Sequence, residues 1–195
     1  MDRELELRFV DGLRTGDPAA FDAVYDAFNG RLYNFLARLS NKRDVAEDLL
    51  EETWLRLVKH ARRLRPDTRL GPWLFTVARH VYASYCRSRL LEDSHAADLI
   101  GLWPHGRPGP SPFEALETSE TGRRLAAALT SLPLAHREAL LLVLVQGLRH
   151  SEAAEICGVT TEAMRQRVSR ARALLARRLT DGQGPVLASL KEITT

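Results

Sequence analysis

Cysteine, lysine and long apolar runs are all scarce in this chain of 195 residues. The two cysteines, Cys86 and Cys157, lie far apart and match no ligand spacing, which favours small apolar side chains over a disulfide or a metal site. No apolar run approaches the ~20 residues of a membrane span. The start MDRELELRF lacks the basic beginning and apolar centre of a signal peptide. These absences predict a cytoplasmic protein.

Catalytic and metal-binding motifs are also missing. The six histidines show no HxxxH or HxH spacing, and the chain has no phosphate-binding glycine loop and no nucleophile-elbow motif. Acidic pairs such as Glu51 and Glu52 are adjacent and point to different faces of a helix, which argues against paired acid-base catalysis. We therefore expect no catalytic residue, no metal, no cofactor and no enzymatic activity.

Charge is present but unevenly distributed. Residues 1–60 carry nine basic and twelve acidic side chains, whereas residues 61–92 carry seven basic and two acidic ones. Residues 93–131 are again slightly acidic, and residues 132–195 are again basic. Because two basic blocks alternate with two acidic ones, the chain is expected to make two separate contacts with a polyanion.

Apolar residues recur every three or four positions through most of the chain, which predicts an all-α protein. The expected helices cover residues 21–39, about 44–60, 72–89, 113–131, 134–145, 151–157 and 161–179. Asp44 is expected to cap the second of these helices together with Glu47, and Pro72 is expected to lie in the first turn of the third.

Residues 93–112 differ from the rest of the chain in composition, because proline and glycine replace the periodic apolar residues there. Such a composition is typical of a linker, or of a disordered tether with no role of its own. We therefore expect two small helical domains, over residues 1–92 and 113–180. A weakly patterned tail over residues 181–195 follows them.

Residues 147–178 form the most informative stretch, because they predict a short helix, a glycine turn and a longer helix. Gly158 lies where a helix end needs a left-handed residue, and Thr160 is placed to cap the next helix. In that helix the residues expected to face a core are Met164, Val168, Ala171 and Leu175, and those on the opposite face are Glu162, Arg165, Gln166, Ser169 and Arg172. This pattern is typical of a DNA-binding helix-turn-helix. An ordinary helical hairpin with a solvated charged face is the alternative.

Two further surfaces are predicted in the N-terminal half. Asp44, Glu47, Asp48 and Glu51 form one acidic stripe along a helix, which is either a docking surface for an arginine-rich partner or a solvated face. A basic surface on the third helix and its preceding loop suits single-stranded or melted nucleic acid. Trp73, Tyr82 and Tyr85 are candidate stacking partners there, although their spacing indicates a core and a core position is favoured for Trp73 and Tyr82.

Together these segments resemble a bacterial extracytoplasmic-function (ECF, group 4) sigma factor of the sigma-70 family. Residues 46–57 (AEDLLEETWLRL) resemble the family's region 2.2, and residues 71–89 (GPWLFTVARHVYASYCRSR) resemble regions 2.3 and 2.4. Residues 131–148 (SLPLAHREALLLVLVQGL), followed by the helix-turn-helix, resemble region 4.

The resemblance implies a non-enzymatic initiation factor that binds core RNA polymerase, recognises the −35 and −10 promoter elements and helps to melt the −10 region. The residues implied to dock on the β′ clamp helices are Glu47, Asp48, Glu51 and Glu52. Those implied to bind the −10 element are Arg62, Arg63, Arg65, Arg69, Arg79, His80, Ser84 and Arg87. Those implied to bind the −35 element are Arg165, Gln166, Arg167, Ser169, Arg170 and Arg172. Region 4 would also hold the β flap, the linker would thread through the polymerase, and an anti-sigma factor is a further expected partner.

Three positions depart from the family pattern. Glu51 replaces a usual glutamine, His80 replaces a frequent asparagine, and Arg149 replaces a common serine, so that Ser151 is the candidate cap of a shorter helix. Promoter sequence therefore cannot be carried over. Two other functions remain open: a stand-alone helix-turn-helix regulator, and a sigma-like protein that titrates a regulator without driving transcription.

Overall fold

The computed structural model describes residues 2–92 and 120–181, and every regular element in these ranges is helical. The all-α prediction is therefore confirmed. The predicted linker at 93–112, the start of the helix predicted from residue 113 and the tail beyond residue 181 lie outside the described residues. None of the described helices is long and apolar enough to cross a membrane.

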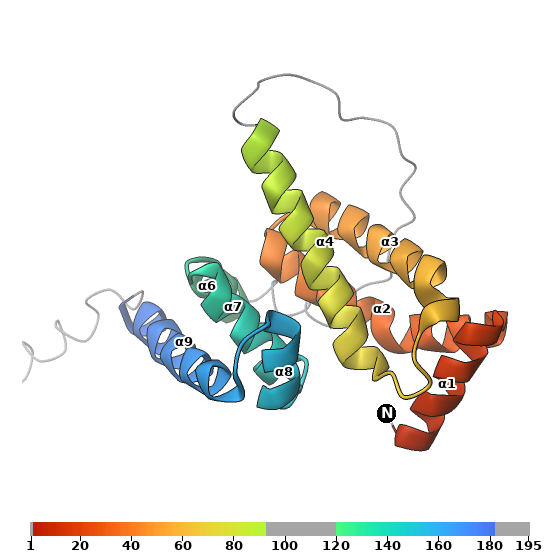
Figure 1. Cartoon of the computed structure of the whole chain (residues 1–195). Helices are drawn as coiled ribbons and strands as arrows, with labels where there is room; N and C mark the ends of the chain where they lie inside the picture. The colour runs from red at the N-terminus through yellow and green to blue at the C-terminus, as the bar shows by residue number, and fades with distance from the viewer. Residues whose placement is uncertain (1, 93–119, 182–195) are drawn as a thin grey trace, which may run out of the picture.

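The N-terminal half is a bundle of four α-helices (Figure 1). These are α1 (Arg3–Thr15), α2 (Pro18–Ser40), α3 (Arg43–His60) and α4 (Leu70–Glu92), with the short 3₁₀ helix η1 (Ala61–Arg63) after α3. Helix α2 begins earlier than the apolar pattern predicts, because the Asp17 side chain accepts a hydrogen bond from the Ala19 N–H at 3.0 Å. Pro18 then occupies the first turn, where a missing N–H costs nothing.

Two local predictions in this half need correction. Helix α1 was not predicted, because its start alternates apolar and charged residues, yet it buries Val10 and Leu13. Asp44 was expected to cap α3, but that helix begins at Arg43 without a side-chain cap. The chain leaves α2 through a left-handed Asn41, and the Ser40 hydroxyl accepts the Lys42 N–H at 3.3 Å, so the next helix starts one residue sooner.

The C-terminal half contains the predicted helix-turn-helix. Its elements are α6 (Glu120–Thr130), α7 (Leu134–Leu140), the π-helical turn η2 (Leu141–Val145), α8 (His150–Cys157) and α9 (Thr161–Asp181). Gly158 is left-handed at φ 66°, and the Thr160 hydroxyl accepts the Ala163 N–H at 3.1 Å, as predicted. Ser151 does not cap α8, because the helix begins at His150 and the Glu152 carboxylate accepts the Arg149 N–H at 2.8 Å.

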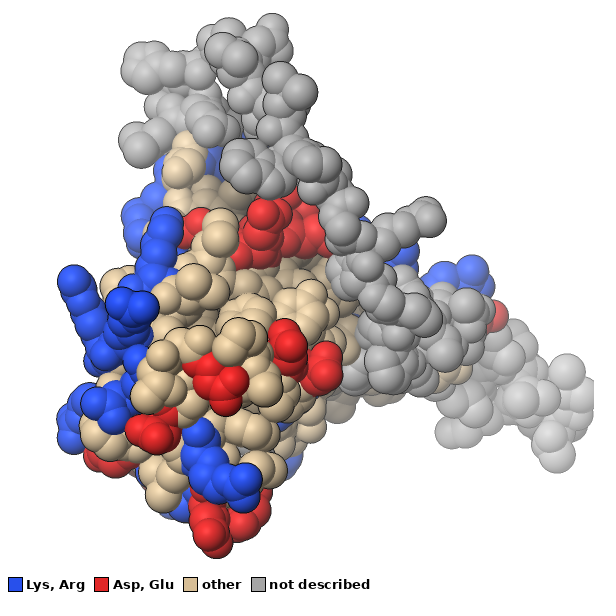
Figure 2. All heavy atoms as spheres, turned by 90° about the vertical axis from the view of Figure 1, so that its right-hand side faces the viewer, with Lys and Arg blue, Asp and Glu red and all other residues tan. Residues whose placement is uncertain are grey.

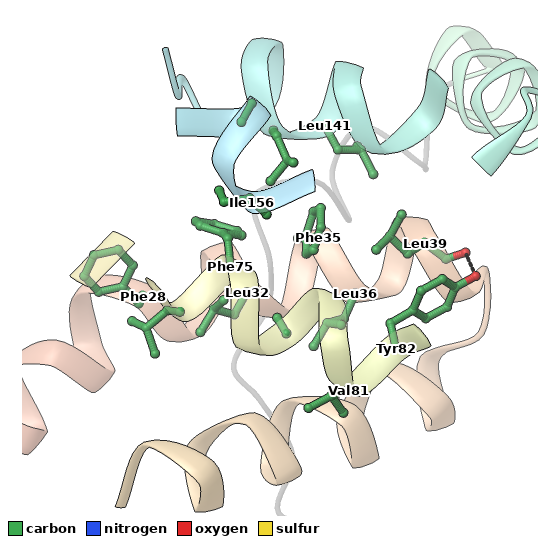
Figure 3. Packing of buried hydrophobic residues seen from close by; sticks show 14 of the residues in the cluster. Phe28, Leu32, Phe35, Leu36, Leu39, Phe75, Val81, Tyr82, Leu141 and Ile156 are labelled. Carbon is green, nitrogen blue, oxygen red and sulfur yellow. Dashed lines mark hydrogen bonds between the residues drawn. The ribbon is translucent and has the colours of Figure 1, made fainter. Parts of the chain in front are cut away.

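The two halves pack against each other over one continuous group of buried apolar residues. In Figure 3, Phe35 of α2 and Phe75 of α4 point toward Leu141 and Ile156 of the C-terminal half. The residues of α9 predicted to face a core are buried in the same group, with Leu175 packed at its edge. The carbonyl of Leu39 joins the halves as well, because it accepts from Tyr82 at 3.0 Å and from Arg137 at 3.1 Å.

Candidate polymerase and nucleic-acid interface

Helix α3 turns its acidic residues outward and its apolar residues inward. Asp48 and Glu51 are exposed and Glu47 is half-buried, whereas Leu57 on the opposite side is fully buried. Glu52, also in the predicted set, pairs with Arg56 on the same helix at 2.8 Å. Figure 2 looks onto the side of the molecule where α1 and α3 lie, and it shows acidic groups toward the middle of this face, basic groups along its left edge and both kinds near its lower end.

The acidic stripe continues into an exposed apolar strip that the sequence reasoning missed. Leu55 and Val58 follow Glu51 by four and seven positions, which places them on the same side of α3. Their exposed fractions are 44% and 58%, high values for branched apolar side chains on a well-packed helix. A face that combines carboxylates with exposed apolar groups is suited to a protein partner.

The predicted −10 residues lie along η1, the following loop and α4. Arg62 and Arg63 are exposed on η1, and Arg65 is exposed on the loop, where it pairs with Asp67 at 3.2 Å. The loop and the start of α4 surround an open hollow of about 410 Å³. Its lining residues are Arg65, Asp67, Thr68, Arg69, Pro72, Trp73, Thr76 and Glu155.

Trp73 packs against the core, as its spacing predicts, but its side chain is only partly buried. It lines the hollow beside Arg65 and Arg69, where a ring next to two guanidinium groups is suited to an unstacked base. Tyr82 is buried as predicted, and its hydroxyl donates to the Leu39 carbonyl. Trp73 is therefore available to contact a base, whereas Tyr82 is a structural residue of the core.

Two of the predicted −10 arginines are paired with the C-terminal half. Arg69 donates to the Glu152 carboxylate of α8, and Arg79 donates to the Glu138 carboxylate of α7 at 3.1 Å. Both carboxylates are buried. Burial raises the pKa of Glu138, and the attraction of Arg79 opposes that rise. The other end of the basic face is open, since His80 and Arg87 are exposed and Arg87 donates to Ser84 at 2.9 Å.

Helix α9 presents most of the predicted −35 residues to solvent. Gln166, Ser169, Arg170 and Arg172 are exposed, and the Arg165 side chain is 62% exposed although it pairs with Glu162 at 3.3 Å. Arg167 differs from the rest of the set, because it is half-buried and its charge acts on Glu138. The structure thus brings five of the six predicted residues onto one open face.

Several residues of this region carried no assignment in the sequence. Glu138 is the clearest, since it directly precedes an apolar run, ALLLVLV, at a buried position where a charge needs a partner. No motif marks Glu152 or Gln146, which gain Arg69 and Arg31 as partners only when the two halves pack. Among the residues that the structure describes, no three metal-ligating side chains cluster. Burial also raises the pKa of the Cys157 thiol to about 11, which keeps it protonated at neutral pH.

Comparison with known families divides the chain at the same place as the fold. Residues 24–91 match sigma-70 region 2, and residues 122–175 match sigma-70 region 4. The ECF RNA polymerase sigma factor EcfG of Rhodopseudomonas palustris is 36% identical over 142 residues, which cover 73% of this chain and 75% of the relative. The ECF RNA polymerase sigma factor SigM of Bacillus subtilis is 32% identical over 152 residues, with coverage of 77% and 90%.

Two solved structures share the fold. The sigma factor RpoE from Bartonella quintana, solved in complex with the anti-sigma factor NepR, is similar with a TM-score of 0.65 and 28% identity, covering 82% of this chain and 96% of that one. CnrH, solved in complex with the cytosolic domain of CnrY, is similar with a TM-score of 0.70 and 19% identity, covering 91% and 98%. The second likeness concerns the fold alone.

Proposed function

The chain belongs to the ECF sigma factors of the sigma-70 family, and from this premise we propose a role for each of its surfaces. It is an RNA polymerase sigma factor that directs promoter-specific initiation by binding the core enzyme, recognising the −35 and −10 elements and helping to melt the −10 region. The chain itself needs no catalytic group, since the polymerase carries out the chemistry. The finer assignment, to group 4 of the family and to the cytoplasm, is part of the proposal.

The acidic face of α3 is the proposed dock for the β′ clamp helices of core polymerase. The supporting observation is the exposure of Asp48 and Glu51 next to the exposed apolar strip at Leu55 and Val58. Carboxylates steer an arginine-rich partner into place, and the apolar strip then contributes burial. Glu47 and Glu52 flank this face, and Glu52 would exchange its partner Arg56 for one on the polymerase.

The hollow beside Trp73 is the proposed site for unstacked −10 bases. Arg65 and Arg69 line it, and the exposed Arg62 and Arg63 precede it in the chain; their positive charge suits phosphates, while the ring offers a stacking surface. The exposed end of α4 at His80 and Arg87 extends the same basic track. Because an imidazole ring presents different donors and acceptors from a carboxamide, the base preference of His80 differs from that of an asparagine.

The open face of α9 is the proposed reader of the −35 element. Arg165 and Gln166 lie in the N-terminal part of the helix, the part that reaches base edges in helix-turn-helix complexes. Ser169, Arg170 and Arg172 follow on the exposed side, where they suit phosphate contacts.

The domain bounds remain a proposal: region 2 over residues 1–92, a linker over 93–112 and region 4 over 113–180. We also include an anti-sigma factor among the partners, since the RpoE relative is bound to one. Such a partner would compete for the surfaces that contact polymerase. The stand-alone helix-turn-helix regulator is not favoured by the comparisons.

Capture of bacterial core RNA polymerase tests this function. The wild-type chain is compared with a triple reversal, Glu47→Lys with Asp48→Lys and Glu51→Lys. We expect the wild type to retain the core enzyme and the reversal to weaken capture by more than about tenfold, because three steering charges change sign.

The matched control reverses three exposed acidic residues elsewhere, Asp11→Lys with Asp22→Lys and Asp26→Lys. It makes the same change in net charge and is expected to bind like the wild type. Equal losses in both variants would show that net charge, not the α3 face, determines binding. A folded wild type that fails to bind core polymerase would contradict the function itself and favour the stand-alone regulator.

A further inference from the structure

The loop that lines the hollow beside Trp73 is tied to the first helix of the chain. The Glu6 carboxylate of α1 accepts a hydrogen bond from the Leu70 N–H at 2.8 Å, and the Arg3 guanidinium donates to the Asp67 carbonyl at 2.8 Å. Each of these bonds joins residues 64 positions apart. In Figure 1 the loop before α4 accordingly lies beside the N-terminal part of α1.

Glu6 is more than one member of an exposed pair on its own helix. Arg3 donates to the Glu6 carboxylate at 2.7 Å, a pair that any helix can form three residues apart. The Glu6 side chain, however, is only 12% exposed, whereas that of Arg3 is 46% exposed. Arg3 therefore satisfies one oxygen of a largely buried carboxylate, and the other oxygen holds the start of α4.

The start of α4 needs this carboxylate because it has no cap of its own. Arg69 directly precedes the helix, and a guanidinium group has donors but no acceptor. The Trp73 N–H makes a bond within the turn, to the Arg69 carbonyl at 3.0 Å, and Pro72 has no N–H. Glu6 accepts the first N–H of the helix from outside, where a negative charge is also favoured by the helix dipole.

The two tied positions enclose the segment that lines the hollow. Thr68 and Arg69 are lining residues, and they lie between Asp67 and Leu70, which α1 holds. Trp73 follows Leu70 by three positions on α4 and lines the same hollow. A binding loop that is already ordered loses less conformational entropy when its ligand arrives. The contacts of α1 thus favour the shape that a base would meet.

We propose that Glu6 and Arg3 are positioning residues for the capture of an unstacked −10 base. Neither lines the hollow, and both act through the backbone of the loop. Helix α1 precedes the residues that match sigma-70 region 2, which begin at residue 24. The −10 site therefore extends beyond the matched region. This inference rests on the proposed function, because it adds two residues to the same −10 site.

Substitutions in α1 test the proposal without touching the hollow. Glu6→Ala removes the acceptor for the Leu70 N–H, whereas Glu6→Gln keeps an oxygen that can accept it. Arg3→Met removes the bond to the Asp67 carbonyl and is expected to have the smaller effect, since the cap remains. The matched control is Glu4→Ala, which removes the same charge from an exposed position in the first turn of the same helix.

Each full-length variant is assembled with bacterial core RNA polymerase and bound to a promoter selected with the wild-type holoenzyme. The −10 region of this probe is opened by mismatches, and affinity is measured by fluorescence anisotropy. We expect Glu6→Ala to bind about tenfold more weakly than Glu4→Ala, because contacts to a stacked base are lost. Glu6→Gln should bind within about threefold of the wild type, because it keeps the hydrogen bond to the loop.

A second set of probes distinguishes positioning from general damage to the fold. Single abasic sites are placed in turn along the non-template strand of the open region, and the site that weakens wild-type binding most identifies the captured base. On that probe Glu6→Ala and the wild type should bind equally, because no base remains for the loop to hold. Circular dichroism and capture of core polymerase are recorded for every variant and should not change.

Two results would overturn the proposal. One is a Glu6→Ala holoenzyme that binds the intact probe as Glu4→Ala does, and the other is a loss that persists in full on the abasic probe. If Glu6→Ala does not fold, Arg3→Met is judged by the same two criteria. Failure of the proposed function looks different: the wild type itself would not capture core polymerase, or no abasic site would weaken its binding.

Discussion

The two basic surfaces of this protein are built from the same residue type but differ in their neighbours. On α4, the Arg79 side chain is 26% exposed and paired with a carboxylate whose own side chain is 6% exposed. On α9, Arg165 is 62% exposed and paired with Glu162, which is 66% exposed. The comparison teaches that arginine content locates a DNA-binding surface but does not reveal whether that surface is free.

The physical basis of the difference is the origin of each acidic partner. Glu162 lies one turn from Arg165 on the same helix, and an exposed pair of this kind contributes only about 0.2–0.5 kcal/mol. Glu138 lies 59 residues from Arg79, and the two meet only because the halves pack. Removal of one partner from a buried pair costs far more than removal from an exposed pair. Part of the −10 surface is therefore engaged by the other half, whereas the exposed face of α9 is not.

The largest expected effect comes from removal of a ring in the contact between the two halves. Phe75 is fully buried, meets Phe35 edge to face and lies under the Arg31 guanidinium. We expect Phe75→Ala to lower the free energy of unfolding by about 3–5 kcal/mol, as large-to-small changes in a core do. Urea titration followed by circular dichroism measures this loss. A decrease below about 1 kcal/mol would show that the ring is not part of a shared core.

A matched change on α3 separates the stability of the bundle from the contact between the halves. Leu57 is also fully buried, but it lies on the side of the bundle that faces away from α8. Leu57→Ala should cost about 2–5 kcal/mol and leave the radius of gyration, measured by small-angle X-ray scattering, unchanged. Phe75→Ala, in conditions where it is still folded, should increase the radius of gyration, because the apolar contact between the halves loses a ring. If the two variants gave the same radius of gyration, Phe75 would not hold the two halves together.

An intermediate effect is expected when one arginine is removed from each surface. Arg165→Ala should weaken promoter binding by about 1–3 kcal/mol and so reduce −35-dependent transcription, with core-polymerase capture unchanged.

Arg79→Ala should impair use of the −10 element and also enlarge the radius of gyration, because Glu138 loses its partner in the other half. Run-off transcription from a promoter selected with the wild-type holoenzyme measures promoter use by both variants. Small-angle X-ray scattering measures the radius of gyration. Normal promoter use by Arg165→Ala would refute the assignment of the recognition face.

Local features of both surfaces could be predicted from the sequence. The spacing of Met164, Val168 and Ala171 placed them in a core, and Gly158 and Thr160 marked the turn and the cap, because these properties depend on neighbours within a few residues. The outward position of Asp48 and Glu51 follows from the same periodicity. The family resemblance supplied the order of the two DNA-binding regions.

Features that depend on tertiary contacts could not be predicted in this way. The pairing of Arg79 with Glu138 and of Arg31 with Gln146 joins residues 59 and 115 positions apart, which no periodicity encodes. Trp73 has the spacing of a core residue and packs against the core, but it also lines an open hollow together with the loop before α4. Arg167 was included in the −35 set, yet it is half-buried and its charge lowers the pKa of Glu138.

The smallest expected effect concerns a single cap on the open surface. The Thr160 hydroxyl accepts the Ala163 N–H at 3.1 Å and so fixes the first turn of α9, which carries Arg165 and Gln166. Thr160→Ala should lower stability by about 1 kcal/mol, and Thr160→Ser should restore most of it, because a serine hydroxyl makes the same bond. Since the cap lies outside the contact between the halves, the radius of gyration should stay at the wild-type value while duplex binding weakens slightly. If Thr160→Ala instead opened the molecule, the open face of α9 would depend on the contact between the halves, and the contrast between the two surfaces would fail.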